Sequence, residues 1–153
     1  MTLPYEGVES GSLRGIPGND AVLDELGRNA EPASGESPYS IDAYVLHTHP
    51  DLCDRLLALA DGVGGVTAVG VYGIPCLIDG DRAIRVFARG TSSLWLSAPA
   101  ASRAALGPDE SWPAPELGPS WIRLDAWQTV RPSNVGTAWL RALVSAAFDP
   151  RDA

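Results

Sequence analysis

The run from Val66 to Pro99 constrains the fold most, because turn signals divide it into short segments that alternate between apolar and polar residues. Turns are predicted at residues 79–81 and 90–92, since glycine and aspartate tolerate the backbone geometry of a tight hairpin loop. Between these turns, alternate residues point to opposite sides: Ile84, Val86 and Ala88 to one, and Arg85, Phe87 and Arg89 to the other. Three or four antiparallel strands with one apolar face are therefore predicted here.

The first 38 residues are predicted to form an acidic arm, because they are rich in glycine, proline, serine and glutamate. One short helix is expected within it, capped by Asn19 and ended by Gly27, with a single apolar stripe: Val22, Leu23 and Leu26. A helix of this length does not stand alone in water. The arm is therefore expected either to be disordered or to pack on the rest of the chain.

Residues 39–150 are predicted to form a single domain around the sheet. Its other elements are expected in this order: a strand or a short helix over Tyr39–His49, a helix from Pro50 to Gly62, a short helix over Pro99–Leu106, a proline-rich loop, a strand over Trp121–Ala126 and a last helix that begins at Ser133 or Asn134.

This order predicts an α+β fold, a two-layer sandwich in which an antiparallel sheet carries helices on one face, with the N-terminal acidic arm in addition. The face under the helices is expected to be aliphatic: Ile84, Val86, Leu94, Leu96, Ile122 and Leu124.

The net charge of −8 is unevenly distributed. Residues 1–50 hold eight acidic residues and two arginines, a net charge of −6, whereas residues 51–153 hold eleven acidic residues and nine arginines, a net charge of −2. Such a chain repels phosphate backbones. No apolar run reaches the roughly 18–20 residues of a membrane-spanning helix, and the N-terminus does not have the pattern of a signal peptide. We therefore expect a cytoplasmic protein without a membrane partner.

The second face of the sheet is the main candidate for a binding site, because it combines guanidinium groups with aromatic rings: Arg85, Phe87, Arg89, Trp95, Trp121 and Arg123. An arginine over an aromatic ring gains about 0.5–2 kcal/mol, and such platforms stack the bases of single-stranded nucleic acids. The alternative interpretation is that the acidic arm folds back and covers this face.

His47, His49 and Cys76 are the candidates for metal or thiol chemistry. The two histidines are the only ones in the chain, and their spacing on a strand places both side chains on one side, as in metal-binding pairs. A nucleophilic cysteine needs a base within reach. Each residue also has a structural explanation, as a helix start or a buried thiol. We therefore predict no catalytic residue, no metal ligand and no cofactor.

Several elements resemble a known family in their order and in short stretches of sequence. The run GIPCLIDGDRAIRVFARGTSSLWLSAPAASRAAL, the strand WIRLDAW and the helix with WLRALVSAAF are similar to the MmcQ/YjbR-like proteins and to the related TfoX N-terminal domain. Across residues 50–148 the matching positions are Gly73, Pro75, Gly80, Phe87, Ala88, Leu94, Leu96 and Trp121. The resemblance implies an α+β sandwich with a double-wing arrangement, a DNA-binding or regulatory role and no established catalysis. Asp81 stands where the family has a lysine, and the acidic arm is an addition.

We therefore predict a non-catalytic binding or regulatory module that acts through the second face of the sheet, with another protein or a second copy of the chain as its partner. Two alternatives stay open: a DNA-binding protein of the double-wing type, and a small metal- or thiol-dependent enzyme that uses His47, His49 or Cys76.

Overall fold

The computed structural model describes residues 6–7, 10–28, 30–32, 40–41, 44–46, 48–61, 63–90, 93–97, 112–125 and 144–148. The elements that it assigns are, in chain order, β1 (Glu6–Gly7), η1 (Ser10–Leu13, a 3₁₀ turn), α1 (Asn19–Gly27), β2 (Ser40–Ile41), β3 (Tyr44–Val45), α2 (Pro50–Ala60), β4 (Thr67–Val71), β5 (Ile74–Ile78), β6 (Ile84–Arg89), β7 (Ser93–Ser97), β8 (Trp112–Pro113) and β9 (Trp121–Asp125). A helical turn follows at 144–147.

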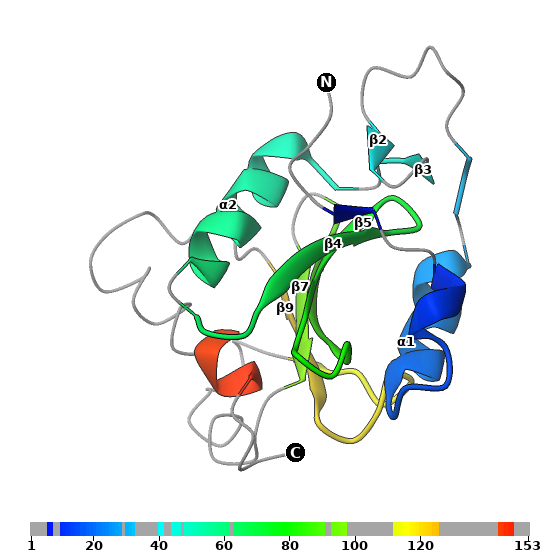
Figure 1. The fold of residues 1–153 in the computed structure, drawn as a ribbon, viewed down its shortest axis with the longest axis vertical. Coiled ribbons are helices and arrows are strands. Elements are labelled where there is room, and N and C mark those ends of the chain that lie inside the picture. Colours follow the sequence, from blue (N-terminus) through cyan, green and yellow to red (C-terminus); the bar gives the residue numbers. More distant parts are fainter. Residues whose placement is uncertain are drawn as a thin grey trace.

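One sheet dominates the described structure, with the strand order β1-β4-β5-β6-β7-β9-β8. All neighbouring strands in it are antiparallel except β1, which pairs with β4 in parallel. The run that begins at Val66 supplies β4 to β7, so the predicted α+β class and antiparallel sheet are confirmed (Figure 1). None of the described helices is long and apolar enough to cross a membrane.

The β4–β5 hairpin has a two-residue turn that the sequence analysis did not identify. Tyr72 and Gly73 have φ angles of 52° and 83°, as the two central residues of a type I′ turn require. A Cβ atom at Gly73 would collide with the backbone carbonyl of Val45 in β3. The turn and the short β2–β3 hairpin therefore approach so closely that only glycine fits. The β2–β3 hairpin lies within the segment Tyr39–His49, where one strand or one short helix was expected.

The first face of the sheet lies under α2 and forms one hydrophobic core. Its side chains are aliphatic: Leu52, Leu56 and Leu59 from α2, Leu77, Val86, Ala88, Leu94, Leu96, Ile122 and Leu124 from the strands, and Val144 and Ala147 from the C-terminal helical turn. The stripe of leucines in α2 and the alternating pattern of the strands predicted this core. The expected helix over Pro99–Leu106, and the expected last helix up to residue 143, lie outside the described residues.

Ile84 is the one residue of the predicted aliphatic face that lies on the other side. A register shift between β5 and β6 pairs Leu77 with Val86 but Ile78 with Ile84, so Arg85 is an extra residue without a partner in β5. Such a β-bulge interrupts the two-residue alternation. As a result Ile84 packs in a second hydrophobic core on the other face of the sheet, while Val86 and Ala88 belong to the first core.

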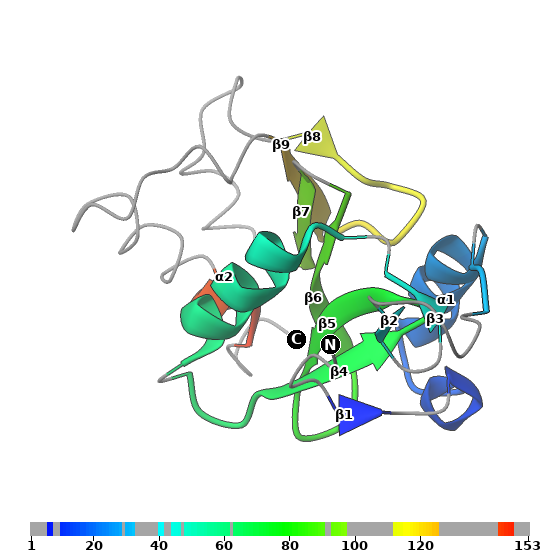
Figure 2. The same ribbon diagram turned by 90° about the horizontal axis from the view of Figure 1, so that it is seen from above.

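The second face is also covered, so the prediction of helices on one face only is wrong. Leu13 of η1 and the α1 stripe of Val22, Leu23 and Leu26 are buried against this face. Figure 2 shows α1 and α2 on opposite sides of the sheet. The physical reason is that this face carries large aromatic side chains, which are apolar and favour a cover that removes them from water. The helix α1 is too short to be stable alone, so it packs its apolar stripe on these side chains.

Asn19 anchors α1 to the sheet through a fully buried side chain. Its Nδ2 donates to the carbonyls of Leu13 and Arg82 at 3.1 and 2.9 Å, and its Oδ1 accepts from the backbone N–H of Ile84 at 2.8 Å. The predicted role of Asn19 as N-cap is therefore wrong. Gly18 is the N-cap residue, and no side chain caps the helix there. The Asn19 amide serves instead as a bridge between η1, α1 and the start of β6.

We expect Asn19→Ala to lower the free energy of unfolding by about 2–4 kcal/mol, because buried backbone groups lose their partners at about 1–3 kcal/mol each. Urea unfolding followed by tryptophan fluorescence measures the change. Asp24→Ala is the matched control on the same helix, since Asp24 is exposed and pairs with the exposed Arg14. A midpoint for Asn19→Ala equal to that of the control would contradict the bridging role.

Candidate functional site

The aromatic side chains of the predicted binding face are core residues. Phe87, Trp95 and Trp121 have exposed fractions of 0%, 9% and 5%. The ring of Phe87 stacks on that of Trp95 with centroids 5.5 Å apart, and its centroid lies 5.7 Å from that of Trp121. These rings lie under η1 and α1, in one cluster with Leu13 and Leu23. The described part of the acidic arm therefore folds over this face, as the alternative interpretation expected.

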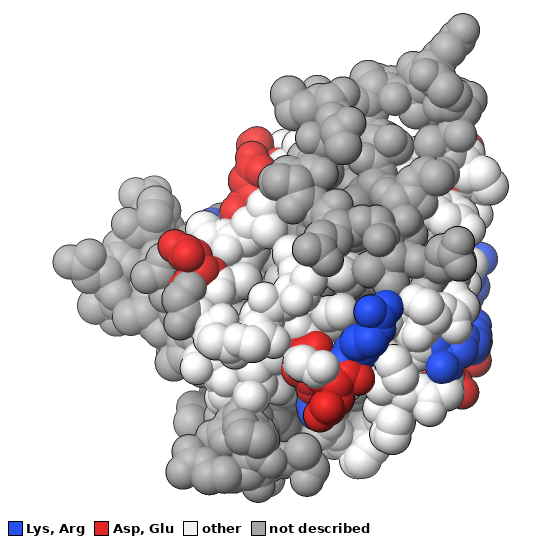
Figure 3. Space-filling model, in the orientation of Figure 1, with Lys and Arg blue, Asp and Glu red and all other residues white. Residues whose placement is uncertain are grey.

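Two of the three arginines predicted on this face form ion pairs with acidic residues of the same chain. Arg89 binds Glu25 of α1 at 3.2 Å between Nη1 and Oε1, and Arg85 binds Asp79 at 3.0 Å between Nε and Oδ2. Arg123 lies over the ring of Trp95, with its Cζ atom 5.6 Å from the centroid. Basic and acidic side chains lie interspersed on the face shown in Figure 3. Paired charges of this kind do not make the broad positive field that binding of a phosphate backbone requires.

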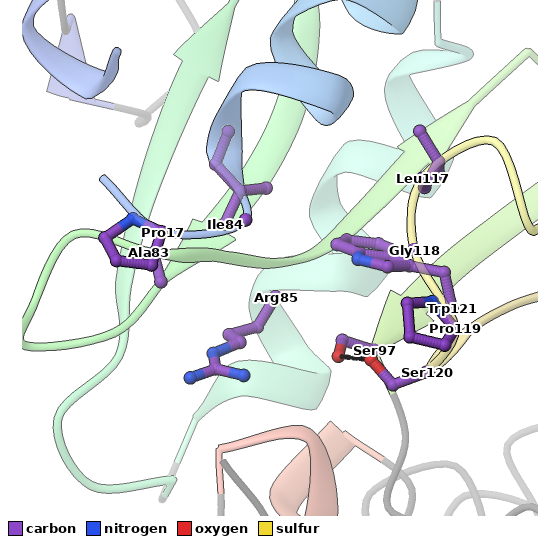
Figure 4. A pocket seen from close by; sticks show the side chains of 11 residues that line it. Pro17, Ala83, Ile84, Arg85, Ser97, Leu117, Gly118, Pro119, Ser120 and Trp121 are labelled. Atoms are coloured by element: carbon purple, nitrogen blue, oxygen red, sulfur yellow. Dashed lines mark hydrogen bonds between the residues drawn. The ribbon is translucent and has the colours of Figure 1, made fainter. Parts of the chain in front are cut away.

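Arg85 and Trp121 do contribute to a pocket, which lies at the edge of the covered face. The pocket has a volume of about 170 Å³. Four segments line it: 17–18 before α1, 83–85 at the start of β6, Ser97 at the adjoining end of β7, and 117–121 from the turn before β9 to its first residue. In Figure 4 the Arg85 side chain lies between Ala83 and Ile84 on one side and the two serines on the other.

The guanidinium of Arg85 is held in place by the hairpin turn before β6. Asp79 Oδ1 accepts hydrogen bonds from the backbone N–H groups of Asp81 at 2.8 Å and Ala83 at 3.0 Å, which fixes the carboxylate. Its Oδ2 then accepts from Nε of Arg85 at 3.0 Å. Among the described residues, this is the one hydrogen bond of the Arg85 side chain, and neither Nη1 nor Nη2 forms a hydrogen bond. The edge formed by Nη1 and Nη2 can therefore bind a further acceptor.

Two serine hydroxyls supply the other polar groups of the pocket. Oγ of Ser97 and Oγ of Ser120 are 2.7 Å apart, and either can be the donor. Whichever donates, the second hydroxyl keeps one hydrogen for another acceptor. The remaining wall is apolar, with Leu117 and Trp121 buried and Gly118 packed so closely that a Cβ would lie 3.2 Å from the Trp121 ring.

The candidates for metal and thiol chemistry do not come together in the described structure. Cys76 is completely buried in the second core, and burial raises the pKa of its thiol. His49 caps α2 with its Nδ1, which accepts from the backbone N–H of Asp51 at 3.1 Å. His47 lies outside the described residues. Among the described residues, no group of three or more potential ligands could hold a metal ion.

Sequence analysis therefore identified Arg85 and Trp121 of this pocket as binding residues, but it did not include Ser97 and Ser120 among them and did not recognise that Asp79 holds Arg85 in place. Asp79 was interpreted as a turn residue only, although its position six residues before Arg85 in a hairpin was a usable signal. No local pattern indicated that residues 117–121 turn back beside Ser97.

Comparisons with known protein families, with curated proteins and with solved structures find no match for this chain.

We expect removal of residues 1–28 to uncover Phe87, Trp95 and Trp121, because η1 and α1 form their cover. Binding of an apolar fluorescent dye should rise and the tryptophan emission should shift to longer wavelength. Removal of residues 1–9 alone is the matched control, since it leaves η1 and α1 in place. Equal dye binding and equal emission of the two truncated proteins would show that α1 is not the cover.

We expect both thiols to be unreactive in the folded protein. Burial, followed by the charge of Asp54, raises the pKa of Cys53 to about 11, and burial also raises the pKa of Cys76. At pH 8 only about a thousandth of Cys53 is then thiolate. Absorbance after addition of a thiol-reactive disulfide reagent should show slow reaction in buffer and fast reaction of both cysteines in denaturant. Fast reaction of Cys76 in the folded protein would revive the thiol-enzyme alternative.

Proposed function

We propose that this protein is a non-catalytic binding module that recognises another protein at the pocket beside Arg85. The observation that carries the proposal is that the Arg85 guanidinium is oriented by Asp79 while its terminal nitrogens are left for another acceptor. Its side chain is partly exposed at 26% and oriented through Nε, and its two terminal nitrogens have no partner among the described residues. An arginine fork prepared in this way is suited to bind an acceptor group from a partner.

The size of the pocket supports a protein as the partner. Pockets for small-molecule ligands and cofactors measure about 300–1,000 Å³. At about 170 Å³ this pocket is smaller than that range. It therefore suits one side chain or one terminal group of a larger molecule, with the rest of the contact formed around the rim.

The chemistry of the lining supports binding rather than a reaction. Among the described residues that line the pocket, Arg85 is the one ionisable group. General acid–base catalysis uses a group whose pKa lies near the working pH, whereas a guanidinium stays protonated. The groups present can orient an acceptor but cannot exchange a proton with it at neutral pH.

The DNA-binding alternative, which the resemblance to the MmcQ/YjbR-like and TfoX N-terminal families implies, has less support. Arg14, Arg28 and Arg89 form ion pairs with acidic residues of this chain. Releasing an arginine for a phosphate would leave its acidic partner close to the nucleic acid. We also propose a cytoplasmic location, which the two buried, reduced cysteines support.

We expect selection of a phage-displayed peptide library on the whole protein to enrich a peptide that binds Arg85. Arg85→Ala should then weaken calorimetric binding of that peptide by at least about tenfold, because loss of one charged hydrogen-bonding partner costs about 1.5–3 kcal/mol. Arg28→Ala is the matched control, because Arg28 is an exposed arginine at the far end of α1. Equal affinity of the wild type and Arg85→Ala for every enriched peptide would refute the proposed site.

The same proteins separate the alternatives. A single-stranded oligonucleotide that binds the wild type with a steep, linear dependence of log affinity on log salt would favour the nucleic-acid function instead. Sedimentation of the wild type as a dimer and of Arg85→Ala as a monomer would identify a second copy of the chain as the partner.

A further inference from the structure

Resting on the proposed function, we infer that the group bound in the pocket is a carboxylate, from an acidic side chain or a chain terminus of the partner. The site consists of the Nη1–Nη2 edge of Arg85, the Ser97–Ser120 hydroxyl pair and an apolar wall formed by Pro17, Leu117 and Trp121.

The first argument is the orientation of Arg85. The β-bulge leaves this residue without a partner in β5, and bulges are used in proteins to redirect a side chain at a functional site. Asp79 takes the Nε side of the guanidinium, and two backbone N–H groups hold Asp79 in turn. What remains is a flat pair of donors, Nη1 and Nη2, whose spacing matches the two oxygens of a carboxylate.

The second argument is the local charge. Arg85 and Asp79 together carry no net charge, and the chain as a whole carries −8. A carboxylate adds one negative charge to this neutral pair, whereas a phosphate group adds about 1.5–2. Among the described residues, no other cationic side chain lines the pocket to balance the second charge. The electrostatics therefore favour a monoanion over a phosphate.

The third argument is the distribution of donors and apolar surface. The hydroxyl pair retains one hydrogen, which can be donated to the ligand as a third hydrogen bond. Pro17, Leu117 and Trp121 present no ionisable group, so they can contact the aliphatic stem that carries the carboxylate. A carboxylate on a short stem uses every part of this lining.

NMR titration of the full-length, ¹⁵N-labelled protein tests the inference with small probes. The probes are blocked glutamate (N-acetyl-glutamate amide), blocked glutamine, N-acetylalanine with a free carboxylate, and inorganic phosphate. We expect saturable shifts at the backbone amides of Ala83, Gly118 and Ser120 with blocked glutamate or N-acetylalanine. Blocked glutamine should bind at least about tenfold more weakly, because it lacks the charge. The stronger of the two carboxylate probes tells a side chain from a terminus as the source.

Variants locate the effect at the arginine fork. Arg85→Gln should abolish the shifts, and Arg85→Lys should weaken binding, because lysine keeps the charge but loses the paired donors. Arg28→Gln should leave the titration unchanged. Equal binding of blocked glutamine, tighter binding of phosphate, or no saturable shift with either carboxylate would overturn the carboxylate inference. A different result would contradict the proposed function itself: Arg85→Ala would bind every library-selected peptide with the affinity of the wild type, whether or not the peptide carries a carboxylate.

Discussion

The buried amide of Asn19 is the interaction on which the arrangement of this protein depends. One side chain joins the carbonyl of Leu13, the carbonyl of Arg82 and the N–H of Ile84, so η1, α1 and the start of β6 are held at one point. Arg82 has a φ of 65°, which an L-residue adopts only at a cost, and the bond to its carbonyl helps to hold it there. Without this bridge, the main remaining attachments of α1 among the described residues would be its apolar stripe and the Glu25–Arg89 pair.

Closure of the second face changes where the molecule can bind anything. An open platform of aromatic rings and arginines would offer a broad surface, whereas the described structure uses those rings as a second core. Among the described residues, an accessible pocket lies at the rim of that face, where the approach to α1, the β6 bulge and the turn before β9 meet. Binding by this protein is therefore expected to depend on one oriented arginine and a small pocket rather than on a large charged surface.

The predictable part of the fold was carried by short-range patterns. The stripe of Val22, Leu23 and Leu26 placed α1 correctly, and the leucine spacing placed α2. Alternation predicted the first core except at Ile84, because a bulge adds one residue to a strand without leaving a local signal. Part of the site could be predicted from the sequence, because Arg85 and Trp121 were on the predicted face. Ser120 could not, because it reaches the pocket through a turn that packs beside Ser97.

By itself, the sequence determined the positions of α1, α2, the strands that follow Val66 and β9, and the apolar side of each except at Ile84, since these properties repeat with the period of one element. Only the tertiary structure decided that both faces of the sheet are buried and that the remaining pocket lies at their edge. The contacts responsible join residues about sixty positions apart, as in Asn19 with Ile84 and Glu25 with Arg89. Such pairings follow from which surfaces bury the most apolar area together, and no local period encodes that choice.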